Sequence, residues 1–165
     1  MAIYGRFEIK VKGASEAVKA ISEAIKRFDE DCYIYQTKKN ITAEEIYKVY
    51  DEDDVYELAT IVARAASGAS FTMEGFIECT VSSEMMHFSI ACENGKLAVR
   101  SSDWCYEYCS DALEEYDTYE EYCEDCDEIE SEEDFEKVKD NELTYLIDGK
   151  IFTELPLGEA IYIEY

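Results

Sequence analysis

Basic residues are scarce in this chain of 165 residues: 15 Lys and Arg stand against 40 Asp and Glu, a formal net charge of −25. Such a charge repels DNA, RNA and anionic membranes, which argues against direct binding to any of them. Long apolar runs are also missing, because eighteen apolar residues never follow one another and charged residues interrupt the first twenty-one. The sequence therefore predicts neither a transmembrane helix nor a signal peptide, and the expected compartment is the cytoplasm.

Signatures of catalysis are equally sparse. His87 is the only histidine, and it lies in the middle of an apolar run typical of a strand. The chain has no glycine-rich phosphate loop, no G-x-S-x-G and no H-E-x-x-H. Paired catalytic carboxylates cannot be singled out among 40 acids. The sequence therefore predicts a protein that is not an enzyme.

Regular patterns predict a mixture of strands and helices. Apolar and polar residues alternate over 3–12 and 71–81, and again over 86–92 and 97–99, as in half-buried strands. Apolar spacings of three and four predict helices over 15–28 and from Asp54 to Gly68. Thr42 and Glu45 form a capping-box pattern, which predicts a short helix carrying Ile46 and Val49.

Two short turn signals predict hairpins. Asn94-Gly95 and Asp148-Gly149 each separate two apolar runs, and both pairs tolerate the positive φ angles of a tight turn. Short strands are expected over 32–36 and 161–165. With 47% hydrophobic residues, the chain can bury a proper core, and we expect one domain over 1–165. The expected fold class is α+β, with an antiparallel or mixed sheet and helices packed on one of its faces.

The negative charge is concentrated in one segment. Residues 101–140 hold eighteen acids and two bases, which is −16 of the total −25. Within this segment, apolar and thiol residues recur at helical spacing and predict one buried stripe: Cys105, Tyr108, Ala112, Tyr116, Tyr119, Cys123 and Cys126. We therefore expect an acidic helical subregion at about 104–139, with a short helix capped by Ser131 at its end. A continuous helix over 104–126 and one broken near Asp117 both fit, since Thr118 and Glu121 form a further capping box.

Seven cysteines in a reducing compartment leave metal binding as one option. Cys105-x3-Cys109 and Cys123-x2-Cys126 supply two close pairs of thiols, as a tetrahedral zinc site needs. A continuous helix would hold the pairs roughly 27 Å apart, so the site requires a hairpin at 117–118. We expect no cofactor, with zinc as the alternative.

Carboxylates on successive helical turns lie about 5–6 Å apart, a spacing comparable with the charges of a nucleic-acid backbone. An ordered array of this kind can occupy the Lys/Arg channel of a nucleic-acid-binding protein. In its small size, its −16 segment and runs such as Glu114-Glu115-Tyr116-Asp117 and Glu120-Glu121-Tyr122, the chain resembles the nucleic-acid-mimic inhibitors of phages and mobile elements, including anti-CRISPR proteins.

This resemblance implies an inhibitor that binds a basic nucleic-acid-binding protein, such as a CRISPR effector or another nuclease, in the cytoplasm of a bacterial host. The residues expected to contact that partner are Glu107, Asp111, Glu114, Glu115, Asp117, Glu120, Glu121, Glu124, Asp125, Asp127 and Glu128. Two alternatives remain open: a small zinc-binding or acidic adaptor domain, and a charged segment that is only a solvated face.

Overall fold

The computed structural model describes residues 2–13 and 15–165, which divide into two compact units. The first unit, which we call the sheet unit, comprises residues 1–101 and 157–165. The second, which we call the acidic unit, comprises residues 102–156 and contains the whole expected acidic subregion. The expectation of a single domain over 1–165 stays a prediction, with this subdivision inside it.

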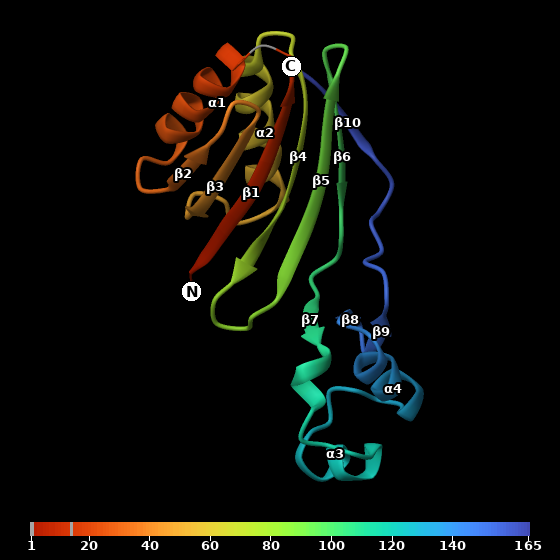
Figure 1. Cartoon of the computed structure of the whole chain (residues 1–165). Helices are drawn as coiled ribbons and strands as arrows, with labels where there is room; N and C mark the ends of the chain where they lie inside the picture. Colours follow the sequence, from red (N-terminus) through yellow and green to blue (C-terminus); the bar gives the residue numbers. More distant parts are fainter. Residues whose placement is uncertain (1, 14) are drawn as a thin grey trace. The chain divides into compact units, whose positions relative to one another are not determined.

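The sheet unit is built on one antiparallel seven-stranded sheet in the order β10-β6-β5-β4-β1-β3-β2 (Figure 1). Its elements are β1 (Ile3–Lys12), α1 (Ser15–Phe28), β2 (Tyr33–Gln36), β3 (Asn40–Ile46), α2 (Glu52–Ala66), β4 (Ser70–Cys79), β5 (Met85–Glu93), β6 (Lys96–Ser101) and β10 (Ile161–Glu164). The first six elements form a split β-α-β arrangement, with β4, β1, β3 and β2 side by side in that order. The expected α+β class is confirmed.

The acidic unit contains a smaller antiparallel sheet, in the order β7-β8-β9, and short helices. Its elements are β7 (Tyr106–Cys109), the 3-10 helix η1 (Ser110–Leu113), α3 (Tyr119–Asp125), α4 (Glu132–Asp140), β8 (Leu143–Ile147) and β9 (Lys150–Phe152). The unit is inserted between two neighbouring strands of the large sheet, β6 and β10. Gly158 N–H donates to the carbonyl of Ser101 over 2.8 Å, so residues of the sheet unit that flank the insertion on its two sides are hydrogen-bonded to each other.

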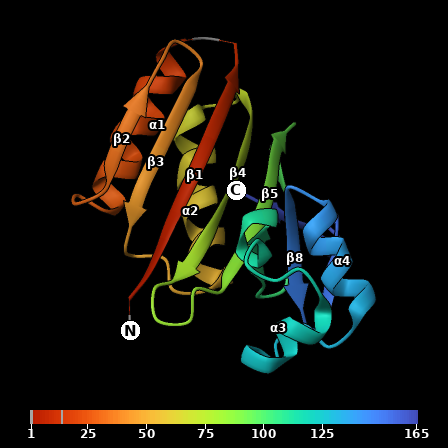
Figure 2. The ribbon, with the colours of Figure 1, turned by 60° about the horizontal axis from the view of Figure 1, so that its bottom comes forward.

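Helices α1 and α2 cover one face of the large sheet, as Figures 1 and 2 show. The predicted stripe of α1 is buried at Val18, Ile21 and Ile25. On the central strand β1, Phe7 and Ile9 are fully buried and alternate with Glu8 and Lys10, which are exposed. The period of two in the sequence thus correctly predicted which face of the sheet meets the helices.

A glycine provides space for the largest buried side chain of this central strand. Gly75 on β4 lies opposite Phe7 in the ladder. A Cβ atom at position 75 would lie 1.9 Å from the carbonyl oxygen of Arg6 and 2.7 Å from the Phe7 ring. Any other residue at position 75 would therefore force β1 and β4 apart.

Both predicted hairpin turns are confirmed. Asn94 and Gly95 have φ angles of 53° and 78°, and Asp148 and Gly149 have 48° and 77°. Positive φ at both central residues matches the right-handed twist of the strands that the turn connects. These turns set the registers of β5 with β6 and of β8 with β9.

The short helix expected from Thr42 and Glu45 is wrong, because residues 40–46 form strand β3. β3 contains a bulge: from Ala43 to Ile46 it advances three residues while β1 advances two. Glu45 takes up the extra residue with a φ of 54°. The bulge places buried residues three apart, and this spacing imitates the period of a helix.

A buried carboxylate joins the end of α1 to the loop after β3. Asp29 is only 2% exposed. Its Oδ2 accepts the N–H of Tyr47 over 2.8 Å, and its Oδ1 accepts the N–H of Asp31 over 3.1 Å. Since both oxygens accept backbone donors, the carboxylate holds two loops in place.

We expect Asp29→Ala to lower the free energy of unfolding by about 1–3 kcal/mol, because the substitution leaves the Tyr47 N–H without its buried acceptor. Urea denaturation followed by circular dichroism measures this loss. Asp31→Ala, at an exposed position, serves as the control and should stay within about 0.5 kcal/mol of the parent protein. Equal stability of the two variants would contradict the structural role of Asp29.

Candidate protein-binding surface

The acidic unit packs around a small aromatic core. Its buried residues come from η1, α3, α4, β8, β9 and the loop before α4: Leu113, Tyr122, Ile129, Phe135, Val138, Leu146 and Ile151. Tyr116, Tyr119, Tyr122 and Phe135 form a ring cluster with centroid distances of 5.5–6.1 Å. Aromatic pairs at such distances are favourable beyond the area they bury.

The expected helix over 104–126 is only partly correct. A helix is present at Tyr119–Asp125, and its N-terminus is capped by Thr118, whose Oγ1 accepts the N–H of Glu121 over 3.2 Å. The expected helix after Ser131 is also confirmed as α4. Residues 106–109 are instead strand β7, paired with β8 about forty residues further along the chain. Pairing with a distant strand thus overrides the helical spacing.

The buried stripe differs accordingly from the predicted one. Tyr122 is the buried residue of α3, whereas Cys123 and Ala112 are exposed. Tyr108, Tyr116 and Tyr119 are partly buried against the core, as the stripe predicted.

Two tyrosine hydroxyls hold the loop between α3 and α4 at a single residue. Tyr119 O–H donates to the Ile129 carbonyl over 3.0 Å, and Ile129 N–H donates to the Tyr122 hydroxyl over 3.1 Å. The two rings are stacked, with their centroids 6.1 Å apart. Both backbone polar groups of a buried residue are therefore satisfied by side chains from one helix, which fixes the loop that carries Asp127 and Glu128.

Other tyrosines bind carboxylates directly. Tyr108 O–H donates to Glu128 Oε2, and Tyr116 O–H donates to Asp125 Oδ2 over 3.2 Å. Burial, followed by the Glu128 hydrogen bond, raises the pKa of Tyr108 above its ordinary value. The pKa of Tyr116 is raised as well, first through its contact with Cys126 and then by burial and Asp125. These phenols remain protonated donors at neutral pH.

All eleven carboxylates expected to contact a partner are exposed. Three of them also have structural roles within the unit: Asp125 and Glu128 bind tyrosines, and Glu121 accepts the N–H of Asp117 over 3.1 Å. The surface extends further than the sequence analysis predicted, since α4 and its flanking loops add six more exposed acids: Glu130, Glu132, Glu133, Glu136, Asp140 and Glu142. The acid content of 130–142 was the available signal for these residues.

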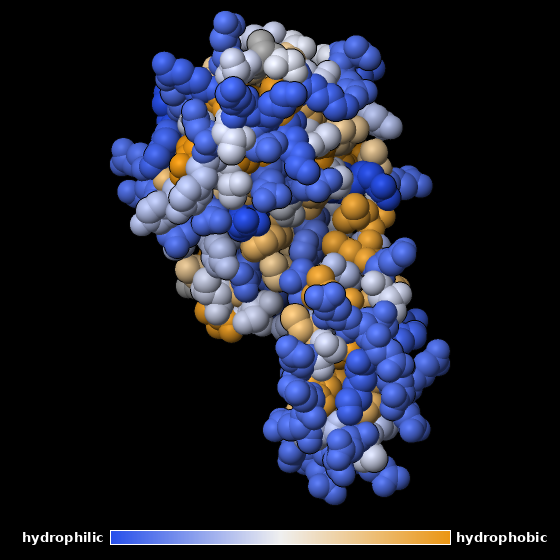
Figure 3. Space-filling model, viewed as in Figure 1, coloured by the Kyte–Doolittle hydropathy of each residue, from blue (hydrophilic) through white to orange (hydrophobic). Residues whose placement is uncertain are grey.

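Counter-charge within the acidic unit is small. The unit holds twenty-one Asp and Glu residues, three lysines and no arginine, a formal charge of −18, and twenty of the acids are exposed. Lys137 pairs with Asp134 at 3.3 Å and with Glu133 at 3.9 Å. Lys139 donates to the Tyr116 carbonyl and lies 5.4 Å from the Phe135 ring centroid. Figure 3 shows hydrophilic residues over most of the visible face around α3 and α4.

The four cysteines of the zinc alternative do not form the expected site. Cys105 is buried and Cys109 is exposed, and Cys123 is exposed while Cys126 is partly buried at the end of α3. Over residues 2–13 and 15–165, no group of three or more His, Cys, Asp and Glu side chains is arranged to hold a metal ion. The strand at 106–109 replaces the helical hairpin that would have brought the two pairs together.

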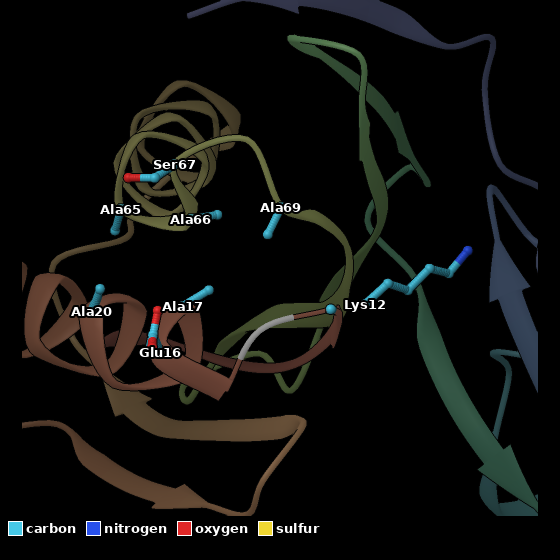
Figure 4. Close-up of a pocket in the computed structure, with 9 residues that line it drawn as sticks. Lys12, Glu16, Ala17, Ala20, Ala65, Ala66, Ser67 and Ala69 are labelled. Atoms are coloured by element: carbon cyan, nitrogen blue, oxygen red, sulfur yellow. The ribbon is translucent and has the colours of Figure 1, made fainter.

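A hollow in the sheet unit offers little chemistry. It measures about 500 Å³ and lies between the start of α1 and the end of α2 (Figure 4). Alanines make up most of its wall, together with Gly13, Ser67, Glu16 and Lys12. Figure 4 shows the Lys12 side chain pointing away from the alanines. The lining resembles close helix packing more than a reactive site.

No protein-family model matches the chain, and no curated protein or solved structure shows significant similarity to it. Among the helices described here, none is long and apolar enough to cross a membrane. The acidic unit is therefore identified as a candidate binding surface from its geometry and charge alone.

We expect Tyr122→Phe to destabilise the acidic unit by about 1–3 kcal/mol, because it removes the acceptor of a buried N–H. Hydrogen exchange at the Ile129 amide should accelerate by on the order of ten- to a hundredfold, corresponding to that loss. Tyr162→Phe, at an exposed position in the sheet unit, is the matched control and should leave this rate unchanged. An unchanged Ile129 rate in Tyr122→Phe would contradict the hydroxyl contact.

We expect stability to fall as the pH rises above about 10, the ordinary pKa of tyrosine. The pKa values of Tyr108, Tyr116, Tyr119 and Tyr122 are raised in the folded state, so the folded protein binds more protons than the unfolded chain above that pH. Their contribution is fully present below pH 10 and is lost above it. Tyrosinate absorbance should show that some tyrosines of the folded protein titrate well above pH 10, and that these tyrosines titrate near pH 10 in urea. If all tyrosines of the folded protein titrate near pH 10, they do not make stability fall with pH in this way.

Proposed function

We propose that this protein is a non-enzymatic inhibitor that binds a basic nucleic-acid-binding protein through the anionic surface of its acidic unit and thereby blocks the nucleic-acid channel of that protein. The observation that carries the proposal is the set of twenty exposed carboxylates in residues 102–156, opposed by three lysines. A partner rich in Lys and Arg would supply the missing counter-charge.

Order in the surface favours mimicry over simple charge attraction. The carboxylates of Asp125 and Glu128 are held by Tyr116 and Tyr108, and the loop between them and α4 is fixed at Ile129. A surface that is already ordered loses little conformational entropy on binding. An unstructured acidic chain of the same charge would have to lose that freedom in the complex.

A CRISPR effector or another nuclease is the partner class proposed, because such proteins hold nucleic acid in positively charged channels. Association should be fast and should weaken steeply with salt, since long-range charge steering is screened within a Debye length of about 8 Å at physiological ionic strength.

A displacement assay tests the proposal. Purified basic nucleases and CRISPR effectors are loaded with a fluorescent duplex, and its release is followed by anisotropy as this protein is added. The variant Glu114→Gln/Glu115→Gln/Glu120→Gln/Glu124→Gln should displace the duplex at least about tenfold less well, because it removes four exposed charges from the surface. Glu121 is left intact, because its carboxylate accepts a backbone N–H.

The matched control carries the same charge change on the sheet unit: Glu16→Gln/Glu57→Gln/Glu74→Gln/Glu93→Gln, all at exposed positions. It should displace the duplex as the parent protein does. Equal loss in both variants, or equal displacement by unstructured polyglutamate of matched charge, would contradict mimicry by an ordered surface. Binding to the target without release of the duplex would favour the adaptor alternative.

A further inference from the structure

Strand β2 is one edge of the large sheet, and its free side presents backbone groups to the outside. Thr37 N–H donates to the Asn40 carbonyl over 2.8 Å, which fixes the alternation of the β2–β3 ladder. The backbone groups of Tyr33 and Tyr35 therefore point toward β3, and those of Ile34 and Gln36 point away from the sheet.

The side chains of this edge are apolar enough to pack against another strand. Tyr33 is 55% exposed and Tyr35 is 60% exposed, on the sheet face opposite the helices. Ile34 and Gln36 lie on the other face, where they line a groove of about 390 Å³ together with Ser22, Glu23 and Lys26 of α1. The groove thus contains one carboxylate and one ammonium group beside the free edge.

The distribution of charge along the chain favours this edge for a contact between two copies. Residues 1–40, which contain α1 and β2, hold eight bases and six acids, a net of +2, whereas the remainder of the chain carries −27. Two copies of such an acidic protein repel each other, and a contact made by residues 1–40 brings no net negative charge to the interface. The other edge strand, β10, lies in residues 157–165, which hold two acids and no base.

We infer that β2 is the contact between two copies of this chain, joined antiparallel about a two-fold axis at Tyr35. In this register, Ile34 of each copy pairs with Gln36 of the other and exchanges two backbone hydrogen bonds with it, four in all. Tyr35 faces Tyr35 of the second copy as a non-hydrogen-bonded pair, in which side chains approach most closely. The two α1 helices run antiparallel beside this contact, and the Lys26 ammonium in each groove is already held by the carbonyls of Glu30 and Cys32. The contact is self-complementary, as a two-fold interface must be.

Amide hydrogen exchange by NMR tests this pairing on the unmodified protein. The Tyr35 amide bonds to β3 and should be protected at every concentration. The Ile34 and Gln36 amides should exchange rapidly in dilute protein and become protected, by at least about tenfold, when the protein is concentrated. Unprotected Ile34 and Gln36 amides in a concentrated sample would overturn the inference.

Sedimentation equilibrium in 150 mM salt supplies the second test. The parent protein should form a dimer, and Tyr35→Glu should raise the dimer dissociation constant by at least about tenfold, since it places two carboxylates face to face. Tyr162→Glu, at the 71%-exposed tyrosine of the other edge strand, is the matched control and should dimerise as the parent does. A monomer at all concentrations, or loss of the dimer only in Tyr162→Glu, would overturn the inference.

Discussion

Mutual repulsion among twenty-one carboxylates is the constraint under which residues 102–156 fold. Like charges on neighbouring helical turns each cost about 0.2–0.5 kcal/mol, so helical propensity alone cannot order this segment. Clustered rings at Tyr116, Tyr119, Tyr122 and Phe135 provide the opposing attraction. Tyrosine hydroxyls then act as neutral donors to acidic side chains and to loop backbone, a role that lysine fills in proteins with balanced charge. The unit therefore keeps an ordered surface while its charge stays almost uncompensated.

Charge is divided between the two units in a way that separates their proposed interactions. Regular strands with mixed charges make up the large sheet, and its β2 edge lies within residues 1–40, which carry a net charge of +2. Most of the negative charge is confined to the insertion. A pair of copies joined at β2 would carry two acidic surfaces, and a target with two basic sites would then bind both with an effective concentration set by their separation.

Local signals allowed much of the fold to be predicted. Asn94-Gly95 and Asp148-Gly149 determine hairpins through their own φ angles, and the α1 stripe is complete within fourteen residues. The predictions were wrong where distant residues determine the local structure. Strand β7 forms because it pairs with β8, and the bulge at Glu45 is set by the register of β3 with β1. Within the acidic unit, the exposure of twenty of the twenty-one acidic side chains could be predicted from their charge. The tyrosine contacts to Ile129 could not be predicted, because they depend on the path of a loop that no local pattern encodes.

The insertion point of the acidic unit has an evolutionary consequence. Because Ser101, the last residue of β6, accepts the N–H of Gly158 shortly before β10, the two chain segments that flank the insertion are held together. Doubling the length of a flexible loop costs only about 0.6 kcal/mol in closure entropy. Recombination could therefore exchange the whole module as a cassette, leaving every ladder of the host sheet in register, and a single scaffold could acquire new specificities without refolding.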